Sequence, residues 1–393
     1  MPIVNRIAEF HEEMTAWRRE LHMYPETAFE EVRTSAFVAD KLKEFGVDAV
    51  HTGIAKTGVV AVLRGQGDGQ RSVAIRADMD ALDIEEENDF DYKSRNPGKM
   101  HACGHDGHTT MLLGAAKYLA ETRNFDGTVY FVFQPAEENE GGGRAMVEDG
   151  LFERFPADAV YGMHNSPGVP VGRFTTRAGP AMAGFDIFEI EIDGYGTHAA
   201  RPHQGVDTVV VQAQIVTALQ TIASRSVNAI DSVVLTITQV HGGDTWNVIP
   251  QKVVLRGTVR AFKPEVQDLT ESRMRRICDS IAEAFGARVA VRYERRYPPT
   301  VNDEAHVDIA AAVAADVFGA DNVRTDSPPG MGSEDFSFML NAKPGAYVRI
   351  GNGAEGEHGG VVVHNPHYDF NDDALPWGAT YWSRLVETTL VRA

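Results

Sequence analysis

The sequence contains little cysteine, no long hydrophobic run and no excess of positive charge. Its two cysteines among 393 residues, Cys103 and Cys278, cannot build a disulfide framework and are typical of a reducing cytoplasm. No run of about 18 apolar residues occurs, and segment 1–22 mixes charged with apolar residues, so we expect neither a membrane span nor a signal peptide. The formal net charge of −19 disfavours nucleic acid as a partner, because its phosphates would be repelled.

The pattern of apolar residues changes twice along the chain, which is long enough for two domains. Up to residue 182, and again from 296, helical periods alternate with short β-branched runs, which predicts an α/β domain with a mixed, mostly parallel sheet. Residues 183–295 follow the order β-α-β-β-α-β of a ferredoxin-like α+β sheet. We therefore predict one domain of residues 1–182 and 296–393 that is interrupted by an inserted domain of residues 183–295.

The same periodicity predicts the individual elements. Helices are expected within 7–21, 26–46, 107–123, 207–225, 265–286 and 304–319. Strands are expected within 58–65, 72–78, 127–138, 185–194, 231–243, 252–262, 288–297 and 345–351. Functional side chains should lie at the carboxyl ends of the parallel strands, where the ends of neighbouring strands meet.

One short segment concentrates residue types that ligate metals. MHACGHDGH, residues 100–108, holds three histidines and one of the two cysteines directly before a predicted helix. A Cys-x-His pair in a loop, here Cys103 and His105, can place a thiolate and an imidazole on one zinc-like ion. A helix-entry turn whose histidines only cap the helix is the plainer interpretation, and the density of these residue types disfavours it.

Three other apolar runs end in the same residue types. Glu137 and Glu138 follow a run rich in Val and Phe, where an unmatched pair of charges would be costly. Adjacent residues at a strand end point in different directions, so one carboxylate can bind a metal while the other faces a metal-bound water. His164 and His364 also follow apolar segments. Because strand ends converge on one crevice, this repetition predicts a single metal site.

The order of short motifs along nearly the whole chain is similar to that of a known family. These motifs are RRELHMYPETAFEE, RADMDAL, MHACGHDGH, QPAEE, GMHN, GTHAARPHQGVD, NVIP, GTVR, GSEDF and HNPHYDFND. They resemble the dinuclear metallo-amidohydrolases that include hippurate hydrolase and the IAA-amino acid amidohydrolases, which are related to aminoacylase-1 and carboxypeptidase G. The resemblance implies an enzyme that hydrolyses N-acyl or N-aroyl amino acids, such as hippurate-like compounds, to a free acid and an amino acid.

The resemblance also implies the cofactor and the catalytic residues. Two divalent metal ions (Zn, Mn, Co or Ni) would be held in the domain of residues 1–182 and 296–393, with Cys103 as the bridging ligand. Glu137 matches the general base that activates a metal-bound water. The implied metal ligands are Cys103, His105, Glu138, His164 and His364.

Four further positions take roles from the same resemblance. Asp78 matches a catalytic aspartate that orients a metal-ligand histidine in relatives, although that histidine position is Arg76 in this chain. His198 matches a histidine that enters a neighbouring subunit's active site, which implies a homodimer or homotetramer formed through the inserted domain. Asn247 and Arg260 are the candidates for binding the substrate's carboxylate, and an exposed strand charge is the plainer interpretation of Arg260.

Three other functions are compatible with these motifs. A dipeptidase or carboxypeptidase of the same family would use the same metal site on a different amide. A cysteine hydrolase would use Cys103 as a nucleophile with a neighbouring histidine as base, would resist chelators and would be inactivated by alkylation. A non-catalytic binding protein would be expected to have lost metal ligands, whereas every ligand position is filled.

Overall fold

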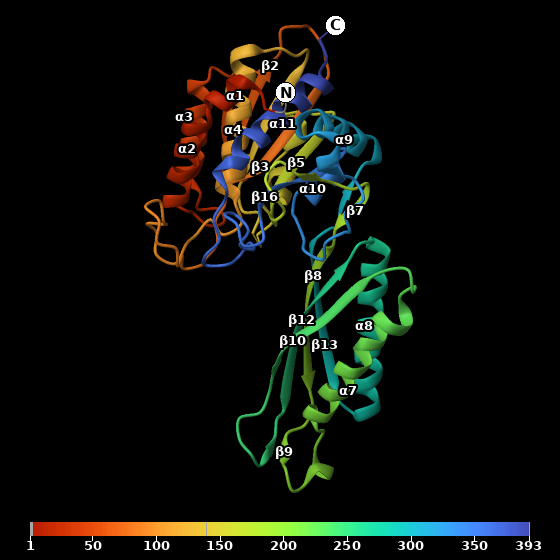
Figure 1. Ribbon diagram of the computed structural model, residues 1–393. Coiled ribbons are helices and arrows are strands. Elements are labelled where there is room, and N and C mark those ends of the chain that lie inside the picture. The colour runs from red at the N-terminus through yellow and green to blue at the C-terminus, as the bar shows by residue number, and fades with distance from the viewer. Residues whose placement is uncertain (1–2, 139, 393) are drawn as a thin grey trace. The chain divides into compact units, whose positions relative to one another are not determined.

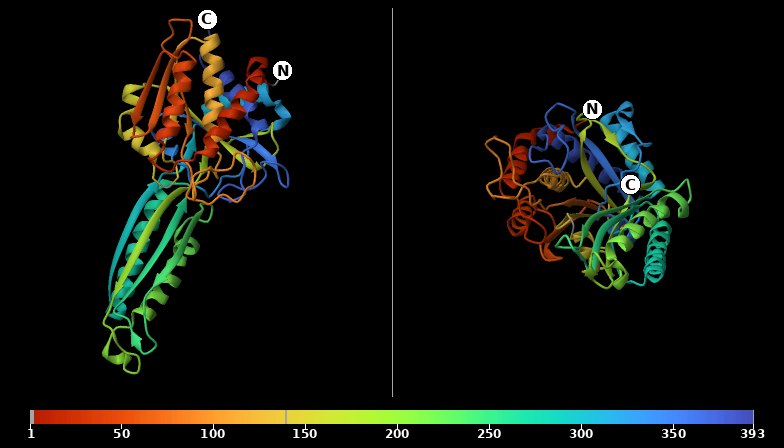
Figure 2. Two further views of the ribbon diagram at one scale, coloured as in Figure 1. Left: turned by 90° about the vertical axis from the view of Figure 1, so that its left-hand side faces the viewer. Right: turned by 90° about the horizontal axis from the view of Figure 1, so that it is seen from below.

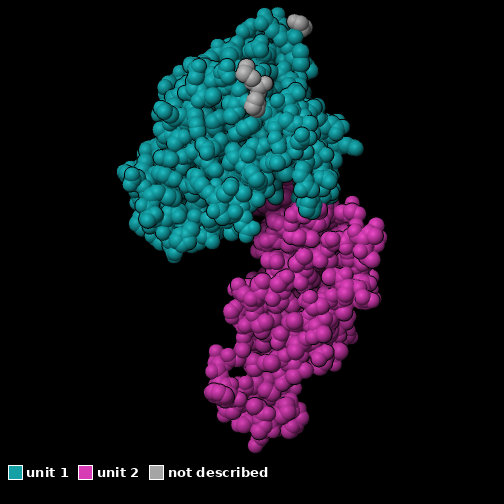
Figure 3. All heavy atoms as spheres, viewed as in Figure 1, with its two compact units in different colours: residues 1–181, 301–328, 335–393 teal, residues 182–300, 329–334 magenta. Residues whose placement is uncertain are grey.

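The computed structural model describes residues 3–138 and 140–392, and the chain divides into two compact units (Figure 3). Unit 1 comprises residues 1–181, 301–328 and 335–393, and unit 2 comprises residues 182–300 and 329–334. The boundary placed at residue 295 from sequence falls inside a strand that runs to Tyr297. Residues 329–334 belong to unit 2 although they lie in the GSEDF region, far beyond the predicted insertion.

Unit 1 is built around one mixed sheet of eight strands in the order β1-β2-β4-β3-β5-β16-β6-β15 (Figure 1). The four central strands, β4, β3, β5 and β16, are mutually parallel, while β1, β2 and β4 pair in antiparallel fashion. The predicted mostly parallel sheet is confirmed. The strands are β1 Ala49–Ile54, β2 Gly58–Arg64, β3 Ser72–Asp78, β4 Thr128–Gln134, β5 Ala159–Gly168, β6 Phe174–Thr175, β15 Val323–Arg324 and β16 Gly345–Ala354.

Helices cover both faces of this sheet. All residues of β3 are buried, which explains why its sequence, SVAIRAD, reads as a continuous apolar run up to its charged end. One face packs in a single core with α2, α3, α4, α9 and α11, whereas α5 and α10 contact each other on the side of β4. The helices are α1 Asn5–Glu9, α2 His11–Met23, α3 Val32–Glu44, α4 His105–Thr122, α5 Gly142–Glu148, α6 Leu151–Arg154, α9 Glu304–Phe318, α10 Ser337–Ala342 and α11 Leu375–Thr389.

The N-terminal helices differ from the expectation in two places. The first is divided at Phe10 into α1 and α2. The second, α3, begins at Val32 instead of near residue 26. The Glu26 carboxylate accepts hydrogen bonds from the amides of Arg33 (3.1 Å) and Thr34 (2.8 Å), so it caps the helix from outside. Residues 26–31 are thereby free to form the loop that contacts the candidate site.

Unit 2 is a four-stranded antiparallel sheet in the order β10-β12-β8-β13, with α7 and α8 packed on one face (Figure 2). This is the predicted β-α-β-β-α-β chain order. The other face carries charged pairs such as Arg256 with Glu189 (2.8 Å) and Lys252 with Glu191 (2.8 Å). The elements are β8 Gly184–Asp193, β9 Thr197–His198, α7 Thr208–Thr221, β10 Val233–His241, β11 Val248–Ile249, β12 Lys252–Ala261, α8 Pro264–Phe285 and β13 Arg288–Tyr297.

Two small features complete the fold. The strands β7 Gly179–Met182 and β14 Thr300–Asn302 pair where the chain passes from one unit to the other, and β9 pairs with β11. Both cysteines are free thiols. Among the described residues, no helix combines the length and the apolar character that a membrane crossing requires.

Candidate metal centre

A tight turn before α4 brings Cys103 and His105 to the same side of the sheet. Gly104, between them, has a φ of 93°, a backbone conformation that favours glycine. A Cβ atom at this position would lie 2.5 Å from the Tyr368 hydroxyl and 2.7 Å from Asn165 Oδ1. The glycine of the Cys-x-His motif is therefore required by both the backbone and the packing.

The implied ligands come together in unit 1. Potential ligand atoms of Cys103, His105 and His164 lie within 4.8 Å of one another, and so do those of Cys103, Glu138 and His364. The Cys103 thiol is 3.3 Å from His164 Nε2, and His364 Nε2 is 3.1 Å from a Glu138 oxygen. Cys103 is shared by the two groups, which is the geometry expected of a ligand between two ions.

The hydrogen bonds of two histidines prepare them to bind a metal. Nδ1 of His105 lies 2.9 Å from the carbonyl oxygen of Asp80, and Nδ1 of His164 lies 2.7 Å from that of Asn165. A carbonyl only accepts, so each Nδ1 carries the proton and each Nε2 presents a lone pair. Nε2 of His105 is buried and has no hydrogen-bond partner among the described residues. A buried nitrogen without a hydrogen bond is costly, and the Asp78 carboxylate lies 3.7 Å from it, so a bound cation would satisfy both groups and the donor set fits a metal site.

Asp78 and Asp80 divide the supporting roles differently from the expectation. The carboxylate of Asp80, which the sequence analysis did not single out, lies 3.2 Å from His105 Nδ1 and accepts from the Glu138 amide at 2.9 Å. Asp78 instead accepts from Nδ1 of His108 at 2.6 Å and from Arg76 at 2.7 Å. Asp78 ends β3 and Asp80 follows it two positions later, and only their contacts distinguish them.

Glu137 lies in the turn that follows β4. It is 7% exposed, and its carboxylate accepts from the Asp335 amide at 3.4 Å. Potential ligand atoms of Glu137, His105 and Glu138 lie within 4.8 Å of one another. The acid therefore lies beside the implied ligands with little exposure to solvent, a position that suits a general base for a metal-bound water.

The site's electrostatics oppose a free thiolate. Burial and the Glu138 carboxylate raise the pKa of the Cys103 thiol. Burial and the neighbouring His108 hold the pKa of His164 well below its usual range, so this imidazole stays neutral. Hydrogen bonds with Cys103 and Glu138 raise the pKa of His364 to about 10. A thiol with a raised pKa is a poor nucleophile, which disfavours the cysteine-hydrolase alternative.

Of the residues predicted in unit 2, two lie together and Arg260 lies apart from them. His198 on β9 and Asn247 before β11 are exposed neighbours, because Val248 pairs with His198 and the Ala199 amide donates to the Asn247 carbonyl at 2.9 Å. Arg260 lies near the opposite end of β12, about 25 Å along the strand from Lys252. It is half-buried, donates to the Ser333 hydroxyl and lies 3.9 Å from the centre of the Phe185 ring.

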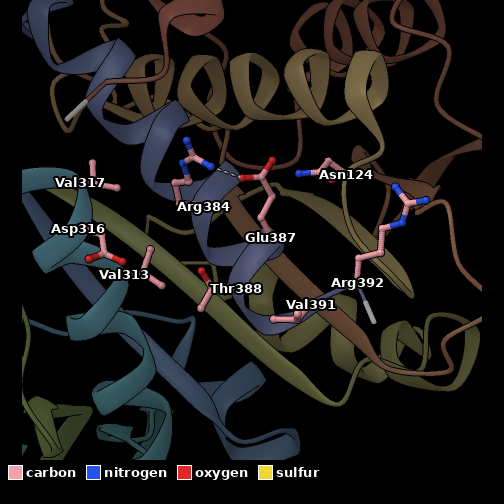
Figure 4. Close-up of a pocket in the computed structure, with 9 residues that line it drawn as sticks. All are labelled: Asn124, Val313, Asp316, Val317, Arg384, Glu387, Thr388, Val391 and Arg392. Atoms are coloured by element: carbon pink, nitrogen blue, oxygen red, sulfur yellow. Dashed lines mark hydrogen bonds and ion pairs between the residues drawn. The ribbon is translucent and has the colours of Figure 1, made fainter. Parts of the chain in front are cut away.

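A separate groove of unit 1 contains none of the predicted site residues. Its volume is about 510 Å³, and an ion pair between Arg384 and Glu387 (2.7 Å) lies along it (Figure 4). The lining residues are Asn124, Val313, Asp316, Val317, Arg384, Glu387, Thr388, Val391 and Arg392.

Known proteins share both this sequence and this fold. A model of peptidase family M20/M25/M40 matches residues 74–388. A hippurate hydrolase of Campylobacter jejuni is 40% identical over 385 residues, which cover 98% of each chain. The chain belongs to peptidase family M20/M25/M40.

Two further members of the M20/M25/M40 family extend the comparison. IAA-amino acid hydrolase ILR1-like 4 of Arabidopsis thaliana is 38% identical over 389 residues, which cover 98% of this chain and 87% of that one. The crystal structure of the Bacillus subtilis YXEP protein, a dinuclear metal binding peptidase of the M20 family, superposes with a TM-score of 0.85 at 34% identity, covering 98% and 99% of the chains. The predicted family, fold class and amidohydrolase activity are confirmed.

Proposed function

We propose that this protein is a metal-dependent amidohydrolase that cleaves N-acyl or N-aroyl amino acids to a free acid and an amino acid. The observation that carries the proposal is the shared position of Cys103 in two groups of metal-ligating residues, with Glu137 beside them. The relatives named hippurate hydrolase and IAA-amino acid hydrolase support this substrate class. A dipeptidase or carboxypeptidase activity is the second candidate, because one relative is named thermostable carboxypeptidase 1.

The ligands proposed for two divalent ions are those implied by the motifs. Thiolate, imidazole and carboxylate together suit Zn, Mn, Co or Ni. When bound, such a pair of ions acidifies a shared water and polarises the scissile carbonyl. The residues that would hold it are Cys103, His105, Glu138, His164 and His364.

Glu137 is the proposed general base. Its carboxylate would take a proton from the attacking water and then deliver it to the nitrogen of the leaving amine, so that the acid returns to its starting state. The low exposure of Glu137 keeps competing water away from this proton. Asp78 and Asp80 would keep His108 and His105 in place, and Asp78 is thus proposed as a positioning residue.

His198 is proposed to act in the site of a second copy of the chain. Its Nδ1 accepts a hydrogen bond from the Ala200 amide at 3.0 Å, so Nε2 carries the proton. An exposed Nε2–H is suited to donating to the oxyanion that forms at the attacked carbonyl. Asn247, beside His198, would reach the substrate from the same copy as His198, and Arg260 is the other candidate for binding the substrate's carboxylate.

A homodimer or homotetramer through unit 2 would supply these contacts. Strand β10 lies at an edge of the four-stranded sheet, and Val234 and Val240 on it are 40% and 53% exposed. An unprotected edge strand is a ready surface for pairing with another chain. The free thiols agree with action in a reducing cytoplasm.

A substrate panel with metal exchange tests the proposal. Chelator-treated protein, reloaded separately with Zn, Mn, Co or Ni, would be assayed with N-benzoyl, N-acetyl and indoleacetyl amino acids and with dipeptides. We expect activity to vanish on chelation, to return with metal and to favour acyl amino acids. Preferential cleavage of dipeptides would establish the peptidase alternative. Activity that survives chelation and is lost on thiol alkylation would establish the cysteine hydrolase.

A further inference from the structure

Glu31 is a buried carboxylate that none of the proposed catalytic steps uses. It precedes α3 in the ETAFEE motif and is 0% exposed. One of its oxygens accepts from the amides of Phe29 (3.0 Å) and Ala136 (2.9 Å), and the other accepts from the Thr57 hydroxyl (2.6 Å). This side chain therefore joins three loops that are distant in sequence.

The two amides bound by Glu31 belong to residues in an unfavourable conformation. Phe29 has a φ of 60° and Ala136 a φ of 54°. Residues with a Cβ rarely adopt this left-handed region, and they remain there only when the surrounding contacts hold them. The same carboxylate oxygen supplies that contact to both residues.

The turn at Ala136 determines where Glu137 points. Ala136 directly precedes Glu137, and its carbonyl accepts from the Gly142 amide at 2.8 Å. On the far side of Glu137, the Glu138 amide donates to Asp80. Hydrogen bonds thus fix the backbone on both sides of Glu137. Glu31 holds the residue before it, and Asp80 holds the residue after it.

We propose that Glu31 is a positioning residue for the general base, because it holds the left-handed turn at Ala136 from which Glu137 projects toward the metal ligands. This inference rests on the proposed function. It assigns to Glu31 no contact with the substrate or the metals. Its effect passes through one backbone hydrogen bond, so an acceptor oxygen at this place is the essential feature.

The two amides that Glu31 binds require an acceptor oxygen, which the acid provides with or without its charge. Burial, together with the nearby Asp80 carboxylate, outweighs the hydrogen bonds and raises the pKa of Glu31 to about 7. In its neutral form the acid still offers a carbonyl oxygen to the two amides and can donate its proton to Thr57. A glutamine presents the same oxygen to the amides and an N–H to Thr57.

Two substitutions separate positioning from charge and from bulk. E31M keeps the length of the side chain and removes the acceptor, and E31Q keeps the acceptor. We expect E31M to lower kcat by about 100-fold while KM stays within about twofold, because a displacement near 1 Å can cost that much. We expect E31Q to restore kcat to within about threefold of the natural protein. E31D, whose shorter carboxylate cannot span both amides, is a milder second variant and should also lose kcat.

The controls keep this result distinct from loss of folding or metal. Glu30 is an exposed neighbour that pairs with Lys99 (2.8 Å), so E30M should leave kcat unchanged. Metal content and melting temperature would be measured for each variant. A kcat within about twofold of the natural value in folded, metal-loaded E31M or E31D would overturn the inference. Absence of amidohydrolase activity in the unsubstituted protein would instead contradict the proposed function.

Discussion

Most of the predicted functional residues of unit 1 are buried, although His364 is exposed, whereas His198 and Asn247 of unit 2 are exposed. In unit 1, Cys103, His105 and Glu137 are at most 7% exposed and contact other residues of the same unit. In unit 2, His198 and Asn247 are exposed beyond the end of the sheet. A buried polar group must find its partners within its own chain, whereas an exposed one is available to another molecule. Unit 1 can thus hold a metal centre by itself, and unit 2 is suited to complete the site of a second copy.

The largest effect on activity is expected from Glu137, a buried residue of unit 1. E137Q removes the base but keeps the shape of the side chain, so we expect kcat to fall by about 100- to 10,000-fold. Metal content should not change, because none of the implied ligands is altered. Steady-state kinetics with an N-acyl amino acid and elemental analysis of the purified protein check both parts.

Glu140 offers a matched control in the same turn. It is exposed, so E140Q should retain full activity. Full activity of E137Q would show that Glu137 is not the general base. Loss of the metals together with the activity would show that Glu137 is a metal ligand.

The second prediction concerns His198, an exposed residue of unit 2. H198A should lose about 100-fold or more in kcat, because one donor to an oxyanion contributes about that much. If His198 acts in a second copy, mixing H198A with E137Q chains should restore activity, since each mixed dimer has one site with both residues intact. Activity of the mixture after subunit exchange, compared with each variant alone, measures this.

His203 lies in the same exposed loop and serves as the control for this experiment. H203A should be fully active and should not rescue H198A beyond the level of dilution with natural chains. Mixtures of H198A and E137Q that stay inactive despite confirmed exchange would show that each chain uses its own His198, and the contrast between the units would lose its functional meaning.

The sequence predicted most of the elements of unit 1 and several of its candidate ligands because these residues follow a simple rule. Strands such as β3 and β4 are continuous apolar runs, and a polar residue directly after such a run must lie at the sheet's edge. The two acids after β4 were singled out in this way, whereas the pair around Gly104 was singled out by its density of metal-ligating residue types. These predictions need only the local sequence pattern and the convergence of parallel strands. The resemblance alone implied which of the two acids is the ligand.

The supporting residues could not be predicted because their roles depend on contacts between distant segments. Asp78 and Asp80 are two residues apart on similar sequence, and only the folded chain shows that Asp80 contacts His105. Glu31 lies 105 residues from Ala136, whose amide it binds. The separation of Arg260 from His198 within unit 2 likewise follows from strand register, which the sequence pattern leaves undetermined.

A third prediction concerns the pH dependence of the stability of unit 1. His22 is 0% exposed, with its ring nitrogens 2.8 Å from Asp106 and 3.2 Å from Glu86. Burial opposes the charge, but these hydrogen bonds outweigh it and raise the pKa of His22 to about 9. The resulting stabilisation, about 3 kcal/mol, is complete below the unfolded pKa of about 6.5 and is lost as the pH rises through 9.

Urea unfolding of H22Q and the natural protein between pH 6 and 9.5 measures the contribution of His22 to the free energy of unfolding. The difference in free energy of unfolding should be largest at pH 6 and should shrink toward pH 9.5. The facing His101 is buried and its pKa is lowered to about 4, and Arg18 stays charged, so neither titrates in this range. A difference that does not change with pH would mean that the pKa of His22 is the same in the folded and the unfolded protein.

The smallest expected effect concerns the pH dependence of the stability of unit 2. It comes from a buried carboxyl group, whereas the effect in unit 1 comes from a buried histidine. Asp186 is 0% exposed, and its carboxylate accepts from Gln267 (2.8 Å) and from the Tyr293 hydroxyl (2.7 Å). Burial outweighs these bonds and raises the pKa of Asp186 to about 6. The folded state therefore holds this proton more tightly than the unfolded chain, so the proton stabilises the fold in acid. This stabilisation, on the order of 2 kcal/mol, is lost as the pH rises from about 4 through 6.

D186N isolates that contribution, because an amide fits the same two partners after reorientation of their donors and acceptors. We expect D186N to gain stability relative to the natural protein as the pH rises from 4 to 7, measured by urea unfolding at each pH. D268N, which changes an exposed partner of Arg295 on the same unit, should show no such trend. An equal pH dependence in D186N and the natural protein would show that folding leaves the pKa of Asp186 unchanged and would contradict this prediction.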